Sequence, residues 1–434
     1  MTEANRSYPD QIRIEPVAAP VNADVLLPGS KSYTNRALIL AALARGRSTI
    51  NAALFSDDTH YMADSLRRLG IPVGEDVAAK RFIVDGAGGT IPSSSAELYV
   101  GNSGTTARFI TALVALGHGE YVIDGIERMR QRPIAPLLDA LRQLHVDAVA
   151  LNDDGCPPLR VTSTGLAGGS AQLAGDTSSQ YFSALLMVGG VLQDGLQIEV
   201  DGDLVSKPYI DMTAATMRIF GVEMQNDNYR RFIVPGGQAY DAIDYQVEPD
   251  ASAASYFFAL SAATGGRVRV LNLGVYSGQG DAHFVDVLEQ MGCTVIRENN
   301  ALEVHGPAKL HGVDVDMNAI SDTVQTLAAI APLADAPVTI RNVAHIRYKE
   351  TDRISAVVTE LRRLGVDVSE REDGLTIHPA TIKPATIETY DDHRMAMSFA
   401  ILGCAAPGIT ISDPGCVAKT FPDFFDVLAR TVIS

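Results

Sequence analysis

The sequence predicts an α/β fold in two domains, built from six βαβαββ repeats with buried helices inside and sheets outside. Three observations predict it. A helix type with a polar first turn and a nearly all-apolar body recurs six times. Its starts at residues 30, 102, 177, 250, 321 and 391 are separated by 72, 75, 73, 71 and 70 residues. A second, amphipathic helix follows each copy.

The first helix of each repeat is expected to be buried on all sides. The first copy begins with Ser30-Lys-Ser-Tyr-Thr-Asn-Arg and continues as Ala-Leu-Ile-Leu-Ala-Ala-Leu-Ala. A helix that is apolar around most of its circumference has no face to offer to water. These helices therefore lie inside, and the sheets and second helices surround them.

The second helices show apolar residues on one face only. In the fifth copy these residues are Ile354, Val357, Val358, Leu361 and Leu364, the i, i+3, i+4, i+7 spacing of a surface helix. We expect these helices over 57–69, 133–144, 208–220, 281–291, 351–364 and 421–429. Glycines that can end a helix follow four of them, at Gly70, Gly221, Gly292 and Gly365.

Hairpins and domain boundaries follow from the same repeat. Alternating stretches such as 294–297 and 302–305 flank turn residues and predict hairpin strands. Three copies make a domain of about 220 residues, which is a common size. The division falls near Glu248-Pro249-Asp250. We expect strand 11–17 to complete the sheet of the C-terminal domain.

Composition limits the partners. With 35 Lys+Arg against 52 Asp+Glu the net charge is −17, so the chain lacks the basic footprint of a nucleic-acid or membrane-surface protein. The four cysteines form no CxxC, residues 1–20 lack the pattern of a signal peptide, and no apolar run reaches about 18 residues. We therefore expect a cytoplasmic protein without a membrane span.

Basic residues gather at the helix starts. Helix N-termini bind anions through free N–H groups and the helix dipole. Arginine and lysine at these places therefore predict a pocket for polyanionic small molecules, with capping and solvated surface charge as the alternative. The cations at or near helix starts are Lys31, Arg36, Arg108, Arg128, Arg130, Arg132, Lys207, Arg347, Lys349, Arg353, Arg394 and Lys419.

Two acids stand among these cations. Asp322 opens the fifth buried helix, and Glu350 lies beside Lys349 at an amphipathic helix start. Each is either a helix cap or a proton-transfer group. The chain has no HExxH, no GxSxG and no GxGxxG after a strand, so we predict no metal and no cofactor.

At these residues the chain resembles the 5-enolpyruvylshikimate-3-phosphate synthase family. The matching motifs span almost the whole chain in order. They are Leu27-Pro-Gly-Ser-Lys-Ser with Asn35-Arg36, Gly101-Asn-Ser-Gly-Thr-Thr-Ala-Arg108, Arg128-Met with Arg132-Pro133, Ser178-Ser-Gln180, Ser206-Lys-Pro-Tyr209, Lys349-Glu-Thr-Asp-Arg353, Asp392-His-Arg-Met-Ala-Met397 and Ala418-Lys-Thr-Phe-Pro422.

The resemblance implies a fold and a reaction. The fold is the two-domain inside-out α/β barrel of enolpyruvyl transferases, here 29–248 and 1–28 plus 249–434, with the active site in the cleft between the domains. The reaction transfers the enolpyruvyl group of phosphoenolpyruvate to the 5-hydroxyl of shikimate 3-phosphate and releases phosphate. The enzyme is expected to act as a monomer.

The resemblance also assigns residues. Asp322 accepts the hydroxyl proton, and Glu350 with Lys31 handles the proton at the vinyl carbon. The residues expected to bind shikimate 3-phosphate are Lys31, Ser32, Arg36, Ser178, Ser179, Gln180, Ser206, Tyr209, Asp322 and Lys349. Those expected to bind phosphoenolpyruvate are Lys31, Gly104, Arg128, Gln180, Arg353, Arg394 and Lys419.

Two positions depart from the family pattern. His345 stands where relatives often carry Asn, so a substrate contact of that Asn is not carried over. Phe109 stands where many have Pro. Gly104 is retained, so we expect inhibition by glyphosate, a competitor of phosphoenolpyruvate.

Two alternative functions are less consistent with the sequence than transfer of an enolpyruvyl group to shikimate 3-phosphate. The sister UDP-N-acetylglucosamine enolpyruvyl transferases usually have a Cys in the loop that is 124–133 here, and this loop has none. A non-catalytic binder of anionic metabolites would be expected to lose Asp322, Glu350 or Lys31, and all three are present.

Overall fold

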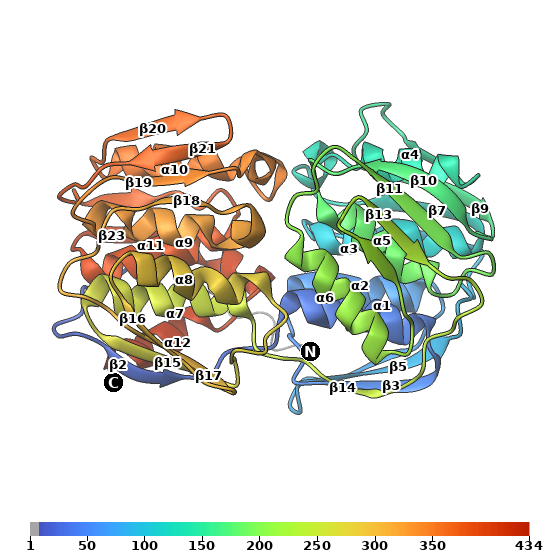
Figure 1. Cartoon of the computed structure of the whole chain (residues 1–434), viewed down its shortest axis with the longest axis horizontal. Helices are drawn as coiled ribbons and strands as arrows, with labels where there is room; N and C mark the ends of the chain where they lie inside the picture. The colour runs from blue at the N-terminus through green and yellow to red at the C-terminus, as the bar shows by residue number, and fades with distance from the viewer. Residues whose placement is uncertain (1–7, 434) are drawn as a thin grey trace. The chain divides into compact units, whose positions relative to one another are not determined.

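The computed structural model describes residues 8–433 and divides the chain into two compact units (Figure 1). The N-terminal unit is Gly29–Val247. The C-terminal unit combines the segment up to Pro28 with the segment from Glu248 onward. Each unit has one hydrophobic core. The chain therefore passes from one unit to the other at residues 28–29 and 247–248.

The N-terminal unit contains six α-helices among the described residues. They are α1 (Lys31–Leu43), α2 (Asp57–Arg68), α3 (Gly104–Leu113), α4 (Ala135–Gln143), α5 (Ser179–Gly189) and α6 (Pro208–Ile219), with the 3₁₀ turns η1 (Val114–Leu116) and η2 (Met129–Gln131). The strands are β3 (Arg45–Asn51), β4 (Val73–Asp76), β5 (Arg81–Ala87), β6 (Ser95–Tyr99), β7 (His118–Asp124), β8 (Asp147–Ala150), β9 (Leu159–Thr164), β10 (Gly169–Ala174), β11 (Leu196–Asp201), β12 (Gln225–Asp227), β13 (Arg231–Val234) and β14 (Asp244–Gln246).

The described part of the C-terminal unit repeats the pattern. Its helices are α7 (Ala251–Thr264), α8 (Phe284–Gln290), α9 (Val324–Ile330), α10 (Arg353–Arg363), α11 (His393–Ala405) and α12 (Phe424–Ile433), with the 3₁₀ turns η3 (Gly280–His283), η4 (Asn318–Thr323), η5 (Ala331–Leu333), η6 (Ala344–Tyr348) and η7 (Pro414–Lys419). The strands are β1 (Gln11–Arg13), β2 (Asn22–Val25), β15 (Arg267–Leu271), β16 (Thr294–Arg297), β17 (Ala301–His305), β18 (Asp314–Asp316), β19 (Val338–Arg341), β20 (Val368–Arg371), β21 (Gly374–Ile377), β22 (Ala385–Ile387) and β23 (Ile409–Ser412).

Each repeat contributes one small mixed sheet. The strand orders are β14-β3-β5-β4, β6-β7-β9-β8 and β10-β11-β13-β12 in the N-terminal unit, and β16-β17-β15-β2, β18-β19-β21-β20 and β1-β23-β22 in the C-terminal unit. Every sheet has one parallel pair, and its other pairs are antiparallel. The predicted six-repeat α/β architecture is confirmed.

Two strands belong to a sheet that their place in the sequence does not suggest. β14 comes just before α7, yet it pairs in parallel with β3 of the first repeat. β2 comes just before α1, yet it pairs with β15 of the fourth repeat. β1 pairs with β23 over Gln11–Arg13 and so completes the last sheet, as predicted for this segment. The role of β2 was not predicted.

The two helix types differ in burial as the sequence predicts. In α1 every residue from Tyr33 to Leu43 is buried, and in α11 every residue from His393 to Cys404 is buried. The second helices α2 and α10 bury only part of their residues. Figure 1 shows α7, α9 and α11 stacked in the middle of the C-terminal unit, with β15–β17 and β19–β21 toward its outside.

Glycine ends four of the second helices in the same way. One cap residue follows each of α2, α6, α8 and α10, and the backbone then turns to positive φ, at +85° in Gly70, +90° in Gly221, +96° in Gly292 and +82° in Gly365. A left-handed residue at this position satisfies the last carbonyls of a helix, and glycine adopts it without strain. The predicted helix ends are confirmed at these positions.

The fifth buried helix begins later than predicted. Residues Asn318–Thr323 form the 3₁₀ turn η4, with a non-helical residue at Ile320 (φ −127°, ψ 38°), and α9 starts only at Val324. The expected start at 321 is therefore wrong. Asp322 lies within the turn, where its carboxylate accepts hydrogen bonds from two arginine side chains.

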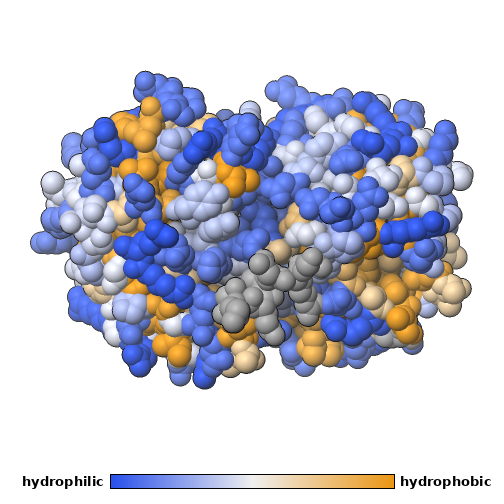
Figure 2. All heavy atoms as spheres, turned by 180° about the vertical axis from the view of Figure 1, so that it is seen from behind, coloured by the Kyte–Doolittle hydropathy of each residue, from blue (hydrophilic) through white to orange (hydrophobic). Residues whose placement is uncertain are grey.

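The surface is mixed. On the face that Figure 2 shows, hydrophilic and hydrophobic residues are interspersed over both units. Exposed large hydrophobic side chains among the described residues include Leu26 and Tyr276. Single exposed side chains of this kind are usual for a globular protein. Among the described residues, every helix is too short or too polar to cross a lipid bilayer.

Candidate active site

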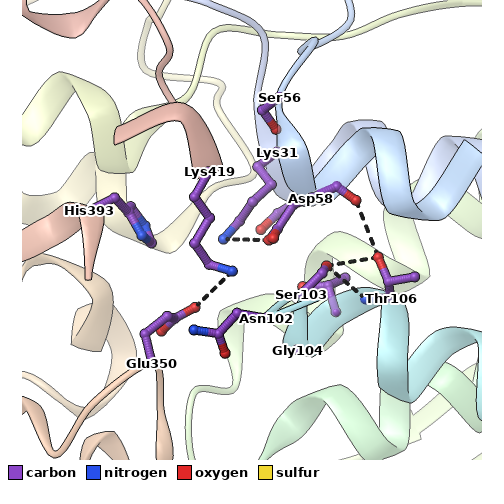
Figure 3. A network of polar contacts seen from close by, with 12 residues as sticks. Lys31, Ser56, Asp58, Asn102, Ser103, Gly104, Thr106, Glu350, His393 and Lys419 are labelled. Carbon is purple, nitrogen blue, oxygen red and sulfur yellow. Dashed lines mark hydrogen bonds and ion pairs between the residues drawn. The ribbon is translucent and has the colours of Figure 1, made fainter. Parts of the chain in front are cut away.

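A first polar cluster lies at the starts of α1, α2 and α3 in the N-terminal unit (Figure 3). Lys31 is the first residue of α1, and its Nζ lies 3.5 Å from Oδ2 of Asp58 in the first turn of α2. The Lys31 side chain is 13 % exposed and that of Asp58 is 2 % exposed. An ammonium group that is mostly withdrawn from water and paired in this way is held in one place.

The start of α3 is braced by an arginine. Ser103 caps the helix by accepting from the backbone N–H of Thr106. Arg132 donates through Nη1 to the backbone oxygen of Asn102 at 2.8 Å and to its Oδ1 at 3.1 Å. A Cβ on residue 104 would lie 2.4 Å from Nη2 of Arg132, so a larger residue here displaces this guanidinium from the start of α3.

Arg36 is almost completely buried and turns into its own unit. Its guanidinium donates to Oγ1 of Thr213 at 2.8 Å, Oγ of Ser183 at 3.3 Å, and the backbone oxygens of Ser32 and Tyr209 at 3.0 Å each. Burial lowers the pKa of Arg36 to about 10, which still leaves it charged at neutral pH. Arg36 thus ties α1 to α5 and α6.

The remaining predicted residues of this unit lie at three further helix or turn starts. Ser178 caps α5 by accepting from the N–H of Gln180, whose Nε2 donates to Oγ1 of Thr105 on α3 at 3.2 Å. Ser179 is buried. Ser206 has a positive φ of +54°, an unfavourable conformation for serine that is often found at functional sites. Half-buried Arg128 donates to Gln131 in η2.

A second polar cluster lies in the C-terminal unit around Arg353, which is 2 % exposed. Its guanidinium donates to three carboxylates at once. Nη1 lies 3.1 Å from Oδ1 of Asp322, Nη2 lies 2.7 Å from Oε2 of Glu350, and Nε lies 2.7 Å from Oδ2 of Asp392. Planar guanidinium groups suit such multiple pairing. Burial disfavours the charged form of Arg353, but the charges of the three carboxylates outweigh this effect and raise its pKa, so the guanidinium stays protonated.

Asp322 bridges two arginines. Its other oxygen, Oδ2, accepts from Nη2 of Arg394 at 2.6 Å. Arg394 also donates to the hydroxyl of Tyr256 at 3.2 Å, and burial raises the pKa of that phenol, so it stays protonated. Asp392 caps α11 by accepting from the backbone N–H of Arg394. The start of α11 and the turn η4 are thus joined through charged groups.

Glu350 of this second cluster also pairs with Lys419 (Figure 3). Nζ of Lys419 lies 3.8 Å from Oε1 of Glu350, and both side chains are less than 10 % exposed. Lys349 is half-buried. Burial and the charge of Lys349 lower the pKa of His345 to about 3, so its imidazole is neutral at pH 7.

The structure gathers eight of the predicted residues into two clusters. Lys31, Gly104 and Gln180 lie in the first, and Asp322, Glu350, Arg353, Arg394 and Lys419 lie in the second. Sequence reasoning assigned no site role to Asp58, Asn102 or Asp392, although Asn102 and Asp392 stand in two of the motifs. Acids and amides at helix starts are ordinary caps, so nothing in the sequence separates these three from capping residues. Within residues 8–433, no group of His, Cys, Asp and Glu side chains could hold a metal ion.

Comparison with known proteins identifies the family. The sequence model described as "EPSP synthase (3-phosphoshikimate 1-carboxyvinyltransferase)" matches residues 17–428. The chain belongs to the EPSP synthase family. It is 55 % identical over 416 residues to the 3-phosphoshikimate 1-carboxyvinyltransferase of Nostoc punctiforme, an alignment that covers 96 % of this chain and 98 % of the relative. The chloroplastic EPSP synthase family member of Brassica napus is 46 % identical over 96 % of this chain and 84 % of its own.

Solved EPSP synthase structures have the same fold. The EPSP synthase of Acinetobacter baumannii superimposes with a TM-score of 0.79 at 25 % identity, over 97 % of this chain and 98 % of that one. The enolpyruvyl transferase fold that the motifs implied is confirmed. The two clusters described above therefore belong to an EPSP synthase family member.

Proposed function

We propose that this protein transfers the enolpyruvyl group of phosphoenolpyruvate to the 5-hydroxyl of shikimate 3-phosphate, with Asp322, Glu350 and Lys31 as catalytic residues. This is the reaction of the EPSP synthase family, a transferase step of the shikimate pathway to chorismate and aromatic amino acids. The observation that carries the assignment of residues is the triple pairing of Arg353 with Asp322, Glu350 and Asp392.

Both substrates are anions, and each cluster offers cations to them. Lys31, Arg128 and the α3 start with Gly104 act on phosphoenolpyruvate from the N-terminal unit, and Arg353, Arg394 and Lys419 act from the C-terminal unit. The residues proposed to bind shikimate 3-phosphate are Lys31, Ser32, Arg36, Ser178, Ser179, Gln180, Ser206, Tyr209, Asp322 and Lys349. Arg36 also ties α1 to α5 and α6.

The pairing of Asp322 supports its role as the base. Two arginines keep Asp322 ionised, which is the form that can accept a proton, and at the same time make it a weaker base. An anion that binds Arg353 and Arg394 would compete for their N–H groups. Asp322 then becomes a better base when phosphoenolpyruvate is bound, so removal of the hydroxyl proton is tied to the presence of both substrates.

Glu350 and Lys31 are proposed to handle the proton at the vinyl carbon. Protonation of that carbon makes the adjacent carbon electrophilic toward the attacking hydroxyl. Glu350 is 6 % exposed and lies between Arg353 and Lys419. Lys31 is oriented by Asp58. Neither proton transfer needs a metal or a cofactor.

Phosphate release by the purified protein tests the reaction. We expect phosphate only when phosphoenolpyruvate and shikimate 3-phosphate are both present. Release with phosphoenolpyruvate and UDP-N-acetylglucosamine instead would assign the protein to the sister reaction. Binding of shikimate 3-phosphate in a calorimeter without any phosphate release would show a non-catalytic binder.

Replacement of Gly104 by Ala tests the α3 start. The added methyl group displaces the Arg132 guanidinium, and overpacking of this kind costs about 1–3 kcal/mol. We expect the KM for phosphoenolpyruvate to rise by roughly tenfold or more. Gly74→Ala is the matched control, because its Cβ would only touch Ile83 at an ordinary 3.7 Å. Equal KM values for the two variants would contradict the role of Gly104.

We further propose that the protein is a cytoplasmic monomer that binds no nucleic acid. The net charge of −17 supports the last point, because a nucleic-acid surface needs a basic footprint. Light scattering at several protein concentrations measures the mass in solution, and a mass that doubles with concentration would contradict the monomer.

A further inference from the structure

A buried carboxyl group outside the predicted site residues lies beside the second cluster. Asp281 belongs to the turn η3 and is 4 % exposed. Its Oδ2 accepts a hydrogen bond from Oγ of Ser252, the second residue of α7. The turn η3 packs against α7 and against η4, which carries Asp322.

The position of Asp281 is held from its own loop. Gln279 accepts from the backbone N–H of Ala251 through Oε1 at 3.1 Å and donates through Nε2 to the backbone oxygen of Pro249 at 2.7 Å. These bonds fasten the start of η3 to the start of α7. Asp281 is therefore placed by the fold rather than by a flexible loop.

The charged neighbours of Asp281 come from three elements. Asp322 on η4 and Asp250 at the cap of α7 disfavour its ionised form, whereas Arg394 on α11 and the Ser252 hydroxyl favour it. Burial has the largest effect. Together they raise the pKa of Asp281 to about 7. On its own turn, His283 is exposed and pairs with Asp286.

The charge balance of the second cluster suggests a use for this group. Arg353, Arg394 and Lys419 carry three positive charges, which the carboxylates of Asp322, Glu350 and Asp392 match. An ionised Asp281 adds a fourth negative charge near Arg394. An anionic substrate group that approaches Arg394 is then repelled, and a proton on Asp281 removes this repulsion.

We propose that Asp281 takes up a proton from solvent when an anionic substrate group binds Arg394. Asp281 thereby acts as a positioning residue for the ion pair between Asp322 and Arg394. The proposal rests on the proposed role of Arg394 in binding phosphoenolpyruvate. No bond of the substrate forms or breaks in this step. The proton passes from the buffer to the Asp281 carboxylate, and the anion then binds Arg394 with one negative charge fewer in its surroundings.

The sign of the pH dependence follows. The protonated form binds the anion more tightly, so kcat/KM for phosphoenolpyruvate falls as pH rises through and above about 7. The total fall is about tenfold for each unit by which the bound anion raises the pKa of Asp281. Asp281→Asn has no group to titrate and resembles the protonated form, so its kcat/KM stays high at pH 9.

The experiment is the pH profile of kcat/KM for phosphoenolpyruvate from pH 6.5 to 9, with shikimate 3-phosphate saturating. The wild-type protein is measured first, and absence of turnover there would contradict the proposed function, not the role of Asp281. We expect a fall of at least fivefold in the wild type and less than twofold in Asp281→Asn. Parallel profiles for the two proteins would overturn the proposal.

Two further variants keep the test decisive if Asp281→Asn folds poorly. Ser252→Ala removes a donor that favours the ionised form, so it should move the fall in kcat/KM to higher pH. Asp286→Asn is the matched control, because this carboxylate on α8 is 45 % exposed and pairs with Arg297 and His283. A Ser252→Ala profile that coincides with those of the wild type and Asp286→Asn would also overturn the proposal.

Discussion

Replacement of Asp322 by Asn is expected to lower kcat by roughly 100- to 10,000-fold, the usual contribution of a general base. The amide cannot accept the hydroxyl proton. Its oxygen can still accept from one of the two arginines that pair with Asp322, so the cluster keeps part of its geometry. Phosphate release with both substrates measures the loss. Calorimetry with shikimate 3-phosphate checks that the substrate still binds.

Asp314→Asn is the matched control for this prediction. Asp314 lies on β18, eight residues before Asp322 in the same repeat, and its side chain is 64 % exposed in an ion pair with Arg341. Loss of such a pair costs little, so activity should be unchanged. If Asp322→Asn retained a tenth or more of the wild-type kcat, the proton would be accepted elsewhere, with Glu350 and Lys31 as the remaining candidates.

Replacement of Arg353 by Met should destabilise the C-terminal unit and abolish turnover. The substitution leaves Asp322, Glu350 and Asp392 without their shared partner in a buried place. Breaking a buried ion pair by removal of one partner costs about 3–5 kcal/mol. We expect a loss of this size in the free energy of unfolding, measured by urea titration at pH 7.

Arg341→Met separates this effect from the loss of any arginine. Arg341 is 44 % exposed and pairs with exposed Asp314. Exposed pairs contribute about 0–1 kcal/mol, so the unfolding curve should hardly move. If Arg341→Met and Arg353→Met lowered the free energy of unfolding equally, the buried ion pairs of Arg353 would contribute no more to stability than an exposed pair. An active Arg353→Met protein would remove this residue from the proposed phosphoenolpyruvate contacts.

The sequence predicted the elements of the fold better than their partners. The period of about 72 residues and the all-apolar helices predicted six repeats with buried helices. The glycines after α2, α6, α8 and α10 marked real helix ends. The exchange of β2 and β14 was not predictable, because each strand pairs with a repeat more than 190 residues away. Short strands of three or four residues carry too little pattern to specify such a partner.

The sequence also predicted the residue types of the candidate site better than their contacts. Cations at helix starts predicted an anion site, and the resemblance to the family assigned roles to Asp322, Glu350 and Lys31. The start of α9 was misplaced, because the pairing of Asp322 with Arg353 and Arg394 draws on residues 31 and 72 positions away. Asp58 and Asp392 were given no site role for a related reason. In the sequence, an acid that caps a helix cannot be distinguished from an acid that orients a buried cation. The structure distinguishes them because it shows Lys31 beside Asp58 and Arg353 beside Asp392.

The sequence by itself determined the repeat, the burial of the first helices, the anionic character of the ligand and, through its motifs, the family. These properties depend on the spacing and type of residues along the chain, so they can be inferred without knowing which distant segments meet. Only the tertiary structure decided which repeat receives β2 and β14, that Arg353 joins three carboxylates, and that Asp281 lies buried on a turn packed against the turn of Asp322. Such contacts depend on where distant segments meet, and burial then sets the energy of each charge that they bring together.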